Sequence, residues 1–173
     1  MHRYMELHSK GSRSNCNGLL IKTVDGQGKG VFAKRFFKKN ALILQFRGVS
    51  TPSYKITDFT HYLQIAPNKY LSPSGNFDDY VNHSCDPNCA VSFKDNIVNL
   101  KAIRNISPGE QLSFDYGTIM FNEPTTFECG CDTSKCRKVI GNFYSMPVGL
   151  QKYYLKNKMV PMLGRYSRLQ LHL

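Results

Sequence analysis

Six cysteines stand out among the 173 residues, because half of them fall within eight positions as Cys129-x-Cys131-x4-Cys136. Three thiolates at this spacing can wrap one face of a tetrahedral zinc ion, and a fourth ligand must then come from elsewhere. Cys85 and Cys89 are the candidates for that ligand. An even number of cysteines would suggest disulfides in a secreted protein, but the polar start of the chain has no apolar signal region. A zinc site is therefore the favoured interpretation, and a redox or disulfide cluster is the alternative.

Three other segments combine residue types that can bind a ligand or react. Residues 28–30, Gly-Lys-Gly, suggest a tight turn whose bare backbone could approach a cofactor closely, although most such turns are only turns. Residues 82–89, NHSCDPNC, place polar, metal-capable and turn-forming side chains where a buried strand would be apolar. Residues 114–117, FDYG, indicate a strand that ends in an aromatic hydroxyl, although a tyrosine there usually packs with its tip in water. Because all three accompany the cysteine cluster, we interpret them as parts of one functional site.

β-branched and aromatic runs alternate with glycine and proline turns along the chain, which predicts short strands. We expect these strands to position the three segments. A spacing of about 8–12 residues between such runs favours an all-β body over a parallel α/β sheet. The predicted strands cover residues 18–24, 31–37, 41–46, 61–65, 69–71, 90–93, 97–102 and 111–116.

Beyond Cys136 the pattern changes to that of one amphipathic helix, with Ser145 near its cap, Pro147 in its first turn and Pro161 after its end. Apolar and large side chains recur at helical spacing, which predicts a buried stripe on one face and lysines on the opposite face. The stripe comprises Val148, Gln151, Tyr154, Leu155 and Met159, and the opposite face carries Lys152, Lys156 and Lys158.

The positive charge is concentrated near the end of the chain. The net charge is +11, yet residues 133–173 hold eight basic and no acidic side chains, while residues 1–132 hold the other 15 basic and all 12 acidic ones. Such a segment predicts an anionic partner, either nucleic acid, an acidic protein face or a membrane surface, unless it is only a solvated helix face.

Composition further limits the class of protein. The chain is 41% hydrophobic and has 11 Phe and 10 Tyr, which is enough for a packed core and argues against disorder. We expect no membrane-spanning helix, because no run of about 18 uncharged apolar residues is present. With no signal peptide in view, we expect a cytoplasmic or nuclear protein, including a bacterial or viral protein that acts in a host nucleus.

At this point the sequence resembles the SET-domain protein lysine methyltransferases that carry a cysteine-rich post-SET zinc segment. The matching elements are GKGVFA at 28–33, NHSCDPN at 82–88, EQLSFDYG at 110–117 and the cysteines of 129–136. They follow the family's order and cover roughly residues 18–140. The intervening HYLQIAPNKYLSPSG looks like a compact version of the domain, of the sort common in small microbial proteins.

The resemblance implies a mainly β, β-clip-like fold of short antiparallel sheets, in which the NHSCDPN and FDYG segments meet in a knot-like crossing. It divides the chain into a flexible lead-in (1–17), a SET domain (18–122), a post-SET zinc segment (123–142) and a basic C-terminal helical extension (143–173). It implies one structural zinc ion and the cofactor S-adenosylmethionine, which binds on one side while the target lysine enters by a narrow channel from the other.

Residue roles follow from the same resemblance. Gly28, Lys29 and Gly30 would contact the cofactor through backbone atoms, and Asn82 and His83 would hold its adenosine and amino-acid portions. Cys85 would complete the zinc site of Cys129, Cys131 and Cys136, which ties the post-SET segment over the cofactor. Phe143 is a candidate for stacking on the adenine.

Tyr116 corresponds to the catalytic tyrosine of the family, whose hydroxyl would sit beside both the methyl group and the amine. Phe114 is where the family tunes the number of methyl groups added, and a phenylalanine there predicts di- or trimethylation. The sequence departs from the family at Asp79, Phe46 and Val49, where an arginine, a channel tyrosine and an acidic residue are common. None of these changes involves Tyr116, Asn82 or His83, so we expect an active enzyme.

The expected substrate is a protein with an exposed lysine, with a histone tail as the leading candidate. The basic extension would contact a nucleosome or nucleic acid, and no membrane is expected as a partner. Two alternatives remain open: a SET-like module with weak catalysis that binds chromatin or an acidic protein, and a zinc domain that binds nucleic acid through its basic segment.

Overall fold

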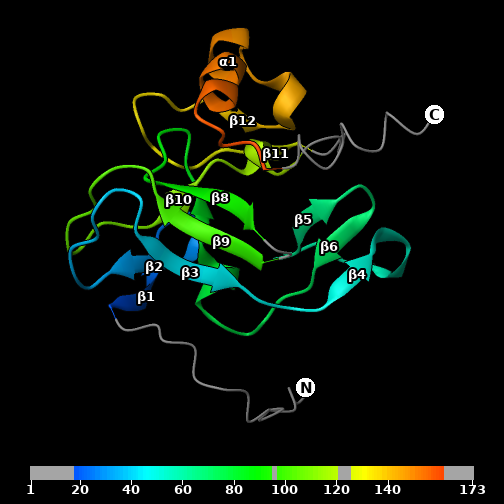
Figure 1. Ribbon diagram of the computed structural model, residues 1–173, viewed down its shortest axis with the longest axis horizontal. Coiled ribbons are helices and arrows are strands. Elements are labelled where there is room, and N and C mark those ends of the chain that lie inside the picture. Colours follow the sequence, from blue (N-terminus) through cyan, green and yellow to red (C-terminus); the bar gives the residue numbers. More distant parts are fainter. Residues whose placement is uncertain (1–17, 95–96, 121–125, 162–173) are drawn as a thin grey trace.

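Short strands make up most of the structure, a computed structural model that describes residues 18–94, 97–120 and 126–161 (Figure 1). The predicted mainly β fold is confirmed, because the described residues contain one α-helix, α1 (Val148–Lys156), and strands of six residues or fewer. The expected lead-in of residues 1–17 and the end of the basic extension, 162–173, lie outside the described residues.

The described strands form five small sheets, and only one of these sheets is parallel. Strand β9 is the centre of the largest continuous ladder, since it pairs antiparallel with both β3 and β8. The sheets are β1 (Leu19–Val24) with β2 (Gly28–Ala33); β3 (Leu42–Phe46), β9 (Ile97–Ala102) and β8 (Cys89–Lys94); β4 (Ser50–Pro52), β6 (Lys69–Leu71) and β5 (Leu63–Ala66); β7 (Asn82–His83) with β10 (Ser113–Phe114); and β11 (Phe127–Glu128) with β12 (Val139–Ile140).

Two predicted local structures are wrong. Residues 28–30 are not a turn but the start of β2, and the hairpin turn is formed by residues 25–27. The strand predicted at 111–116 is reduced to β10, because the chain leaves it at Asp115. The Asp115 side chain accepts a hydrogen bond from the Gly117 amide and so caps a 3-10 turn, η3 (Tyr116–Thr118).

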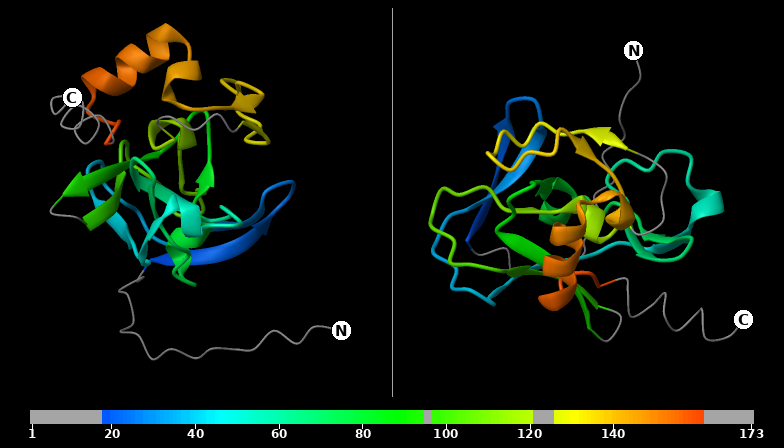
Figure 2. Two further views of the ribbon diagram at one scale, coloured as in Figure 1. Left: turned by 90° about the vertical axis from the view of Figure 1, so that its right-hand side faces the viewer. Right: turned by 90° about the horizontal axis from the view of Figure 1, so that it is seen from above.

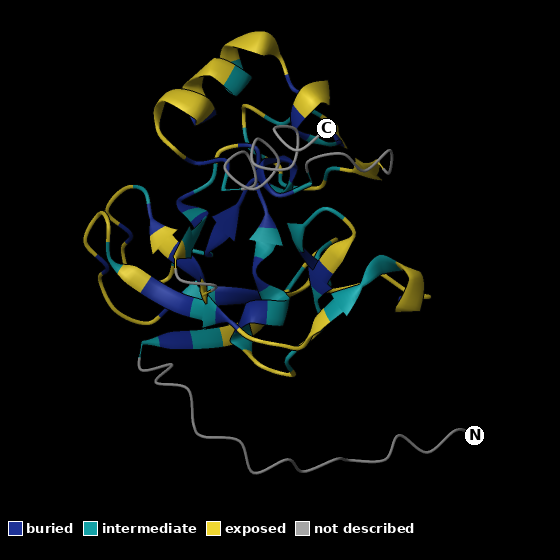
Figure 3. Ribbon diagram, turned by 45° about the vertical axis from the view of Figure 1, so that its right-hand side comes forward, coloured by how far each residue is buried: buried dark blue, intermediate teal, exposed yellow. Residues whose placement is uncertain are grey.

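The main core lies between the sheets of residues 19–119, where Val31, Leu100, Ile106 and Leu112 have no exposed surface. Burying a large apolar side chain stabilises a fold by about 1.5–3 kcal/mol, so this cluster provides most of the rigidity around β7 and β10. Figure 3 shows these buried strands in the lower part of the molecule, beneath a more exposed upper part.

The upper part consists of β11, β12, a 3-10 turn η4 (Phe143–Ser145) and α1, which stack on one end of the sheets (Figures 1 and 2). A second cluster of buried side chains holds α1 there: Phe143, Met146, Tyr154, Met159 and Val160. Ala90 and Phe93 of β8 pack against this cluster, so it joins the upper part to the main sheet.

The predicted buried stripe of the helix is only partly correct. Tyr154 and Met159 are buried, but Val148 is 65% and Leu155 is 44% exposed. The reason is that the helix packs through Leu150 and Tyr154, which are four residues apart, so its buried face does not include Val148 or Leu155. Within the described ranges, no helix is long and apolar enough to cross a membrane.

Candidate active site and cysteine cluster

The parallel pair β7–β10 brings together two segments that are about thirty residues apart in sequence. Asn82 lies beside Ser113 and His83 lies beside Phe114 in this register. The Asn88 side chain reinforces the crossing, because its Nδ2 donates to the Gln111 carbonyl at 2.8 Å and its Oδ1 accepts from the Ser113 amide at 3.0 Å. The predicted meeting of the NHSCDPN and FDYG segments is therefore confirmed.

A cavity of about 620 Å³ opens beside this crossing, a size typical of a small-molecule or cofactor site. It is lined by five of the residues singled out from the sequence: Phe46, Asn82, His83, Phe114 and Tyr116. The hairpin turn contributes Gly26 and Gln27, and the segment beside the cysteines contributes Phe127, Glu128 and Gly130. One space is thus bordered by both the SET and the post-SET portions of the chain.

Tyr116 is fixed at both its backbone and its side chain. Its amide donates to His83 Nδ1 at 3.1 Å, and its hydroxyl donates to the Val81 carbonyl at 3.0 Å. Burial raises the pKa of Tyr116 to about 12, so the phenol stays protonated at neutral pH. The side chain is therefore a positioned hydroxyl and not a base.

Aromatic rings form the wall next to this hydroxyl. The Phe114 ring lies 4.9 Å from the Tyr116 ring, and the Phe46 ring packs edge-on against Phe114 at 5.9 Å. Phe114 and Tyr116 both line the cavity, although Phe114 ends β10 and Tyr116 already belongs to η3. Neither phenylalanine brings a hydroxyl into this part of the cavity.

His83 links Tyr116 to the cysteines. Because Nδ1 accepts the Tyr116 amide, the proton of the neutral ring is on Nε2, which points at the Cys85 sulfur 3.3 Å away. Burial lowers the pKa of His83 to about 4, more than the nearby Asp115 carboxylate raises it, so the ring is neutral at pH 7. The role of His83 in holding a cofactor remains a prediction.

The glycine segment of β2 lies behind the cavity and not in its wall. The Asn82 side chain donates to the Lys29 carbonyl at 3.0 Å, and the Lys29 ammonium lies over the Tyr80 ring at 5.1 Å. A Cβ on Gly30 would come within 2.8 Å of both Gln111 and Val24, so this position needs glycine. Contact of residues 28–30 with a cofactor stays a prediction.

Gln27 connects the hairpin turn to the cysteine segment. Its Nε2 donates to the Gly130 carbonyl at 2.8 Å, and its Oε1 accepts from Gln111 Nε2 at 3.3 Å. Gln27 and Gly130 both line the cavity, so this bridge holds its rim closed on one side. This contact could not be predicted from the sequence, because a glutamine in a surface turn belongs to no recognisable pattern.

The structure does not bring Phe143 into the cavity. Its ring is 2% exposed and packs in the second cluster of buried side chains, so neither of its faces is available to an adenine. The ring that does line the cavity from the post-SET side is Phe127, which is 49% exposed. Phe127 was not predicted from the sequence, nor were Phe59, His61 and Tyr62, which also line the cavity.

The departure from the family at Asp79 has a role within the fold. Its carboxylate accepts hydrogen bonds from the Ser74 and Gly75 amides at 2.6–3.0 Å. The neighbouring Asp78 accepts from the Arg47 amide and the Ser74 hydroxyl, each at 2.7 Å, and burial raises its pKa. The acidic pair therefore braces the turn that forms one wall of the cavity.

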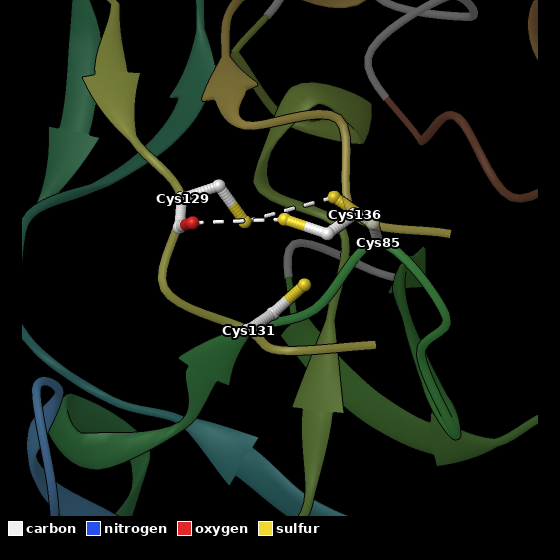
Figure 4. Close-up of side chains that lie close together, drawn as sticks. All are labelled: Cys85, Cys129, Cys131 and Cys136. Carbon is white, nitrogen blue, oxygen red and sulfur yellow. Dashed lines mark hydrogen bonds between the residues drawn. The ribbon is translucent and has the colours of Figure 1, made fainter. Parts of the chain in front are cut away.

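Cys85, Cys129, Cys131 and Cys136 converge, and their sulfur atoms all lie within 4.8 Å of one another (Figure 4). A tetrahedral zinc ion with bonds of about 2.3 Å would separate its sulfur ligands by about 3.8 Å. The Cys85 and Cys129 sulfurs are 3.7 Å apart, which fits that geometry. The set predicted from the sequence is therefore brought together, with thiols that fit zinc.

The other described cysteine, Cys89, is buried in the main core with no exposed surface and is not part of this set. All five described cysteines are free thiols, so the alternative of a disulfide cluster is not observed among them. Cys16 lies outside the described residues. Although burial opposes ionisation, hydrogen bonds from Thr133 and the neighbouring cysteines lower the pKa of Cys131, while burial raises the pKa of Cys129, so Cys131 is the first of the two to become a thiolate.

Comparison with known proteins agrees with this geometry. Residues 28–117 match the SET domain family. The chain is 28% identical over 128 residues to histone-lysine N-methyltransferase trr of Drosophila melanogaster, which covers 65% of this chain and 5% of that protein. It is 34% identical over 96 residues to an H3 lysine-36 specific histone-lysine N-methyltransferase of Mycosarcoma maydis, covering 51% of this chain and 10% of that protein.

The fold has a solved counterpart. A crystal structure of KRYPTONITE in complex with mCHG DNA and SAH has a TM-score of 0.61 and 25% sequence identity, over 74% of this chain and 29% of that chain. The chain thus spans less than a third of the length of each of these relatives. Since the family match covers more than half of its residues and includes both crossing segments, the chain belongs to the SET domain family.

Proposed function

We propose that the protein is an S-adenosylmethionine-dependent protein-lysine N-methyltransferase that acts on histone lysine. The observation that carries the proposal is the single cavity in which Tyr116, Phe114 and the Asn82–His83 pair meet the segment of the cysteine cluster. The names of the relatives, which are histone-lysine N-methyltransferases, and the SAH bound to KRYPTONITE support it.

The charge of the cavity wall fits cationic ligands. Four carboxylates, Asp58, Asp78, Asp79 and Glu128, line it together with one arginine, Arg47, although the whole chain is strongly basic. A sulfonium cofactor and a lysine ammonium are both cations, so a negative wall attracts them against the field of the rest of the molecule. When bound, S-adenosylmethionine supplies the methyl group as an electrophile. Gly26, Gln27, Asn82, His83 and Gly130 would hold it.

The residues of this chain prepare the lysine for reaction. A free lysine has a pKa of about 10.4 and must lose its proton before it can attack, which an apolar channel favours. Phe46, Phe114 and the ring of Tyr116 provide that channel. The Tyr116 hydroxyl and the Val81 carbonyl would then order the approach of the amine, and correct positioning can supply about 7–11 kcal/mol of the barrier reduction.

Incubation of the full chain with labelled S-adenosylmethionine and core histones tests the proposal. We expect label in histone protein, localised to a lysine by mass spectrometry. Absence of label from core histones and from a panel of histone peptides, with folded and zinc-loaded protein, would favour the second candidate, a catalytically weak module that binds chromatin. The basic segment favours that candidate, because Lys138, Lys152, Lys156 and Lys158 are exposed and no acidic residue occurs after Asp132.

We infer that the enzyme adds two or three methyl groups, and Phe114→Tyr is expected to reduce the number. A hydroxyl at this 3% exposed position would hold a water beside the amine, in space that a methylated lysine needs to turn. One such hydrogen bond contributes about 0.5–1.5 kcal/mol, enough to shift product ratios by about two- to tenfold toward monomethyl-lysine. Mass spectrometry at long incubation measures the ratio, with the exposed Phe36→Tyr as the matched control. A wild type that stops at monomethyl-lysine contradicts the inference.

The basic segment is expected to make nucleosome binding dependent on salt. Each neutralised phosphate contributes a slope of about −0.9 to log K against log salt concentration. Replacing Lys152 and Lys156 with glutamine should therefore reduce the slope by about 1.8, while activity on a short free peptide should change little. Filter binding at salt concentrations between about 50 and 200 mM measures this slope for the wild type and the double variant. Equal slopes for the wild type and the double variant would identify these lysines as a solvated helix face.

A further inference from the structure

Asp115 is a buried carboxylate with 1% of its surface exposed, and it directly precedes Tyr116. Its side chain is hydrogen-bonded to three parts of the chain: the adjacent turn η3, Arg137 after the last clustered cysteine, and Tyr154 of helix α1. A buried charge is tolerated only where it is paired and fully hydrogen-bonded. The partners of Asp115 are therefore required to keep this carboxylate buried next to Tyr116, which lines the cavity.

Both oxygens of Asp115 are fully used. Arg137 donates through Nη2 to Oδ1 at 2.8 Å and through Nη1 to Oδ2 at 2.6 Å. The Gly117 amide donates to Oδ1 at 3.1 Å, and the Tyr154 hydroxyl donates to Oδ2 at 2.9 Å. Each oxygen accepts two hydrogen bonds, and the two-pronged contact of Arg137 fixes the plane of the carboxylate.

His83 lies near the carboxylate but does not compensate its charge. Its Nδ1 is 3.6 Å from Asp115 Oδ1, yet this nitrogen accepts the Tyr116 amide and has no proton to donate. Among the described residues, Arg137 is the cation in contact with Asp115. Arg137 directly follows Cys136 in the sequence, so the post-SET segment itself supplies the charge that neutralises Asp115.

The carboxylate controls the turn that carries Tyr116. Its bond to the Gly117 amide begins η3, and the Asp115 carbonyl accepts from both the amide and the hydroxyl of Thr118, at 3.0 and 2.7 Å. A rotation of the carboxylate would turn η3 and move the Tyr116 hydroxyl away from Val81. The orientation of this hydroxyl thus depends on groups that do not touch the cavity.

We propose that Tyr154 and Arg137 are positioning residues, which hold the Asp115 carboxylate and through it aim the Tyr116 hydroxyl at the reacting groups. The inference rests on the proposed function. It makes α1 and the post-SET segment part of the catalytic apparatus, because the helix contributes the Tyr154 hydroxyl and the post-SET segment contributes the guanidinium. Neither Arg137 nor Tyr154 lines the cavity.

A purely structural role for Tyr154 would lead to a different experimental result from the positioning role. Its ring is 1% exposed and packs among Phe143, Met146, Met159 and Val160, so it also anchors α1. If anchoring were its whole role, losing the hydroxyl would lower the melting temperature but leave the turnover of the folded enzyme unchanged. The Tyr154→Phe variant keeps the ring and separates these two roles.

The test compares Tyr154→Phe with Tyr153→Phe, which makes the same chemical change on the neighbouring, 52% exposed tyrosine of α1. With core histones and S-adenosylmethionine, we expect kcat of Tyr154→Phe to fall about tenfold, because misplacement of reacting groups by a fraction of an ångström has effects of this size. KM for the cofactor and the zinc content should stay within twofold of the wild type. Tyr153→Phe should match the wild type in every respect.

Two further measurements keep the proposal testable whatever the activity. In protein labelled with 15N-tyrosine, the amide signal of Tyr116, identified by its loss in Tyr116→Phe, should shift in Tyr154→Phe and not in Tyr153→Phe. Arg137→Lys keeps the charge but loses the two-pronged contact, so it should also shift the Tyr116 amide signal. This variant provides the test if Tyr154→Phe folds poorly. An unmoved Tyr116 signal, or an unchanged kcat in an active enzyme, overturns the positioning role. A wild type that transfers no methyl group overturns the proposed function instead, and the Tyr116 signal then decides the positioning by itself.

Discussion

Replacing Tyr116 with phenylalanine is expected to reduce methyl transfer by about 100-fold or more, equivalent to about 2.7 kcal/mol or more of barrier. The change removes one hydroxyl and the hydrogen bond to the Val81 carbonyl, but little volume. The ring would keep its contacts with Phe114 and His83, and the amide would keep its bond to His83. The loss should therefore appear in kcat, while cofactor affinity and the fold are preserved.

Single-turnover kinetics with labelled cofactor and a histone peptide measure this loss, and titration with SAH measures the affinity. Tyr54→Phe is the matched control, since it removes the same hydroxyl from an 83% exposed side chain and should leave the rate unchanged. Unlike both of these variants, His83→Ala should first weaken the affinity for SAH. It removes the acceptor of the Tyr116 amide and the contact with Cys85 together. A Tyr116→Phe variant with the turnover of the wild type would identify Tyr116 as a packing residue.

The strands that were predicted correctly are those whose own sequence specifies them. β6 and β9 have the predicted bounds, since each is an apolar or β-branched run between turn residues. The two-residue strand β7 has no such run, and it exists because β10, about thirty residues later in the sequence, lies alongside. Val148 and Leu155 of α1 were assigned to the core from their spacing, but spacing alone does not say which part of a helix finds a surface to cover.

The candidate active site shows the same division between features that local sequence specifies and features that depend on distant partners. The cysteine set, Tyr116, Phe46 and Phe114 could be predicted because their residue types and order resemble a known family. The partners of Asp115 could not, because Arg137 and Tyr154 are 22 and 39 positions away and carry no local pattern. Phe143 was proposed from its distance to the last cysteine, yet the local turn η4 directs it into the second cluster of buried side chains.

Zinc removal is expected to abolish cofactor binding, because the metal would fix the segment around Cys129 that borders the cavity. Cys85 and Cys129 are 44 positions apart, so a shared ion closes a long loop and orders the post-SET segment. Structural zinc sites contribute about 10–16 kcal/mol of apparent binding free energy in small peptides. This would add to the direct contacts that also cross here, including the Gln27–Gly130 hydrogen bond and the ion pairs Lys135–Asp86 and Arg137–Asp115. Phe127, Glu128 and Gly130, which line the cavity next to Cys129, would lose their positions with the ion.

We expect about one zinc ion per chain by metal analysis, as a four-thiolate site requires. Cys85→Ser should reduce both the zinc content and the affinity for SAH, the latter by at least about tenfold, or about 1.4 kcal/mol. Cys89→Ala is the matched control, because Cys89 is equally buried but lies in the main core away from the cluster, and it should retain the metal. Full-length protein with no zinc and six free thiols would contradict the site. Unchanged SAH affinity after chelation would show instead that the metal stabilises the segment without shaping the cavity.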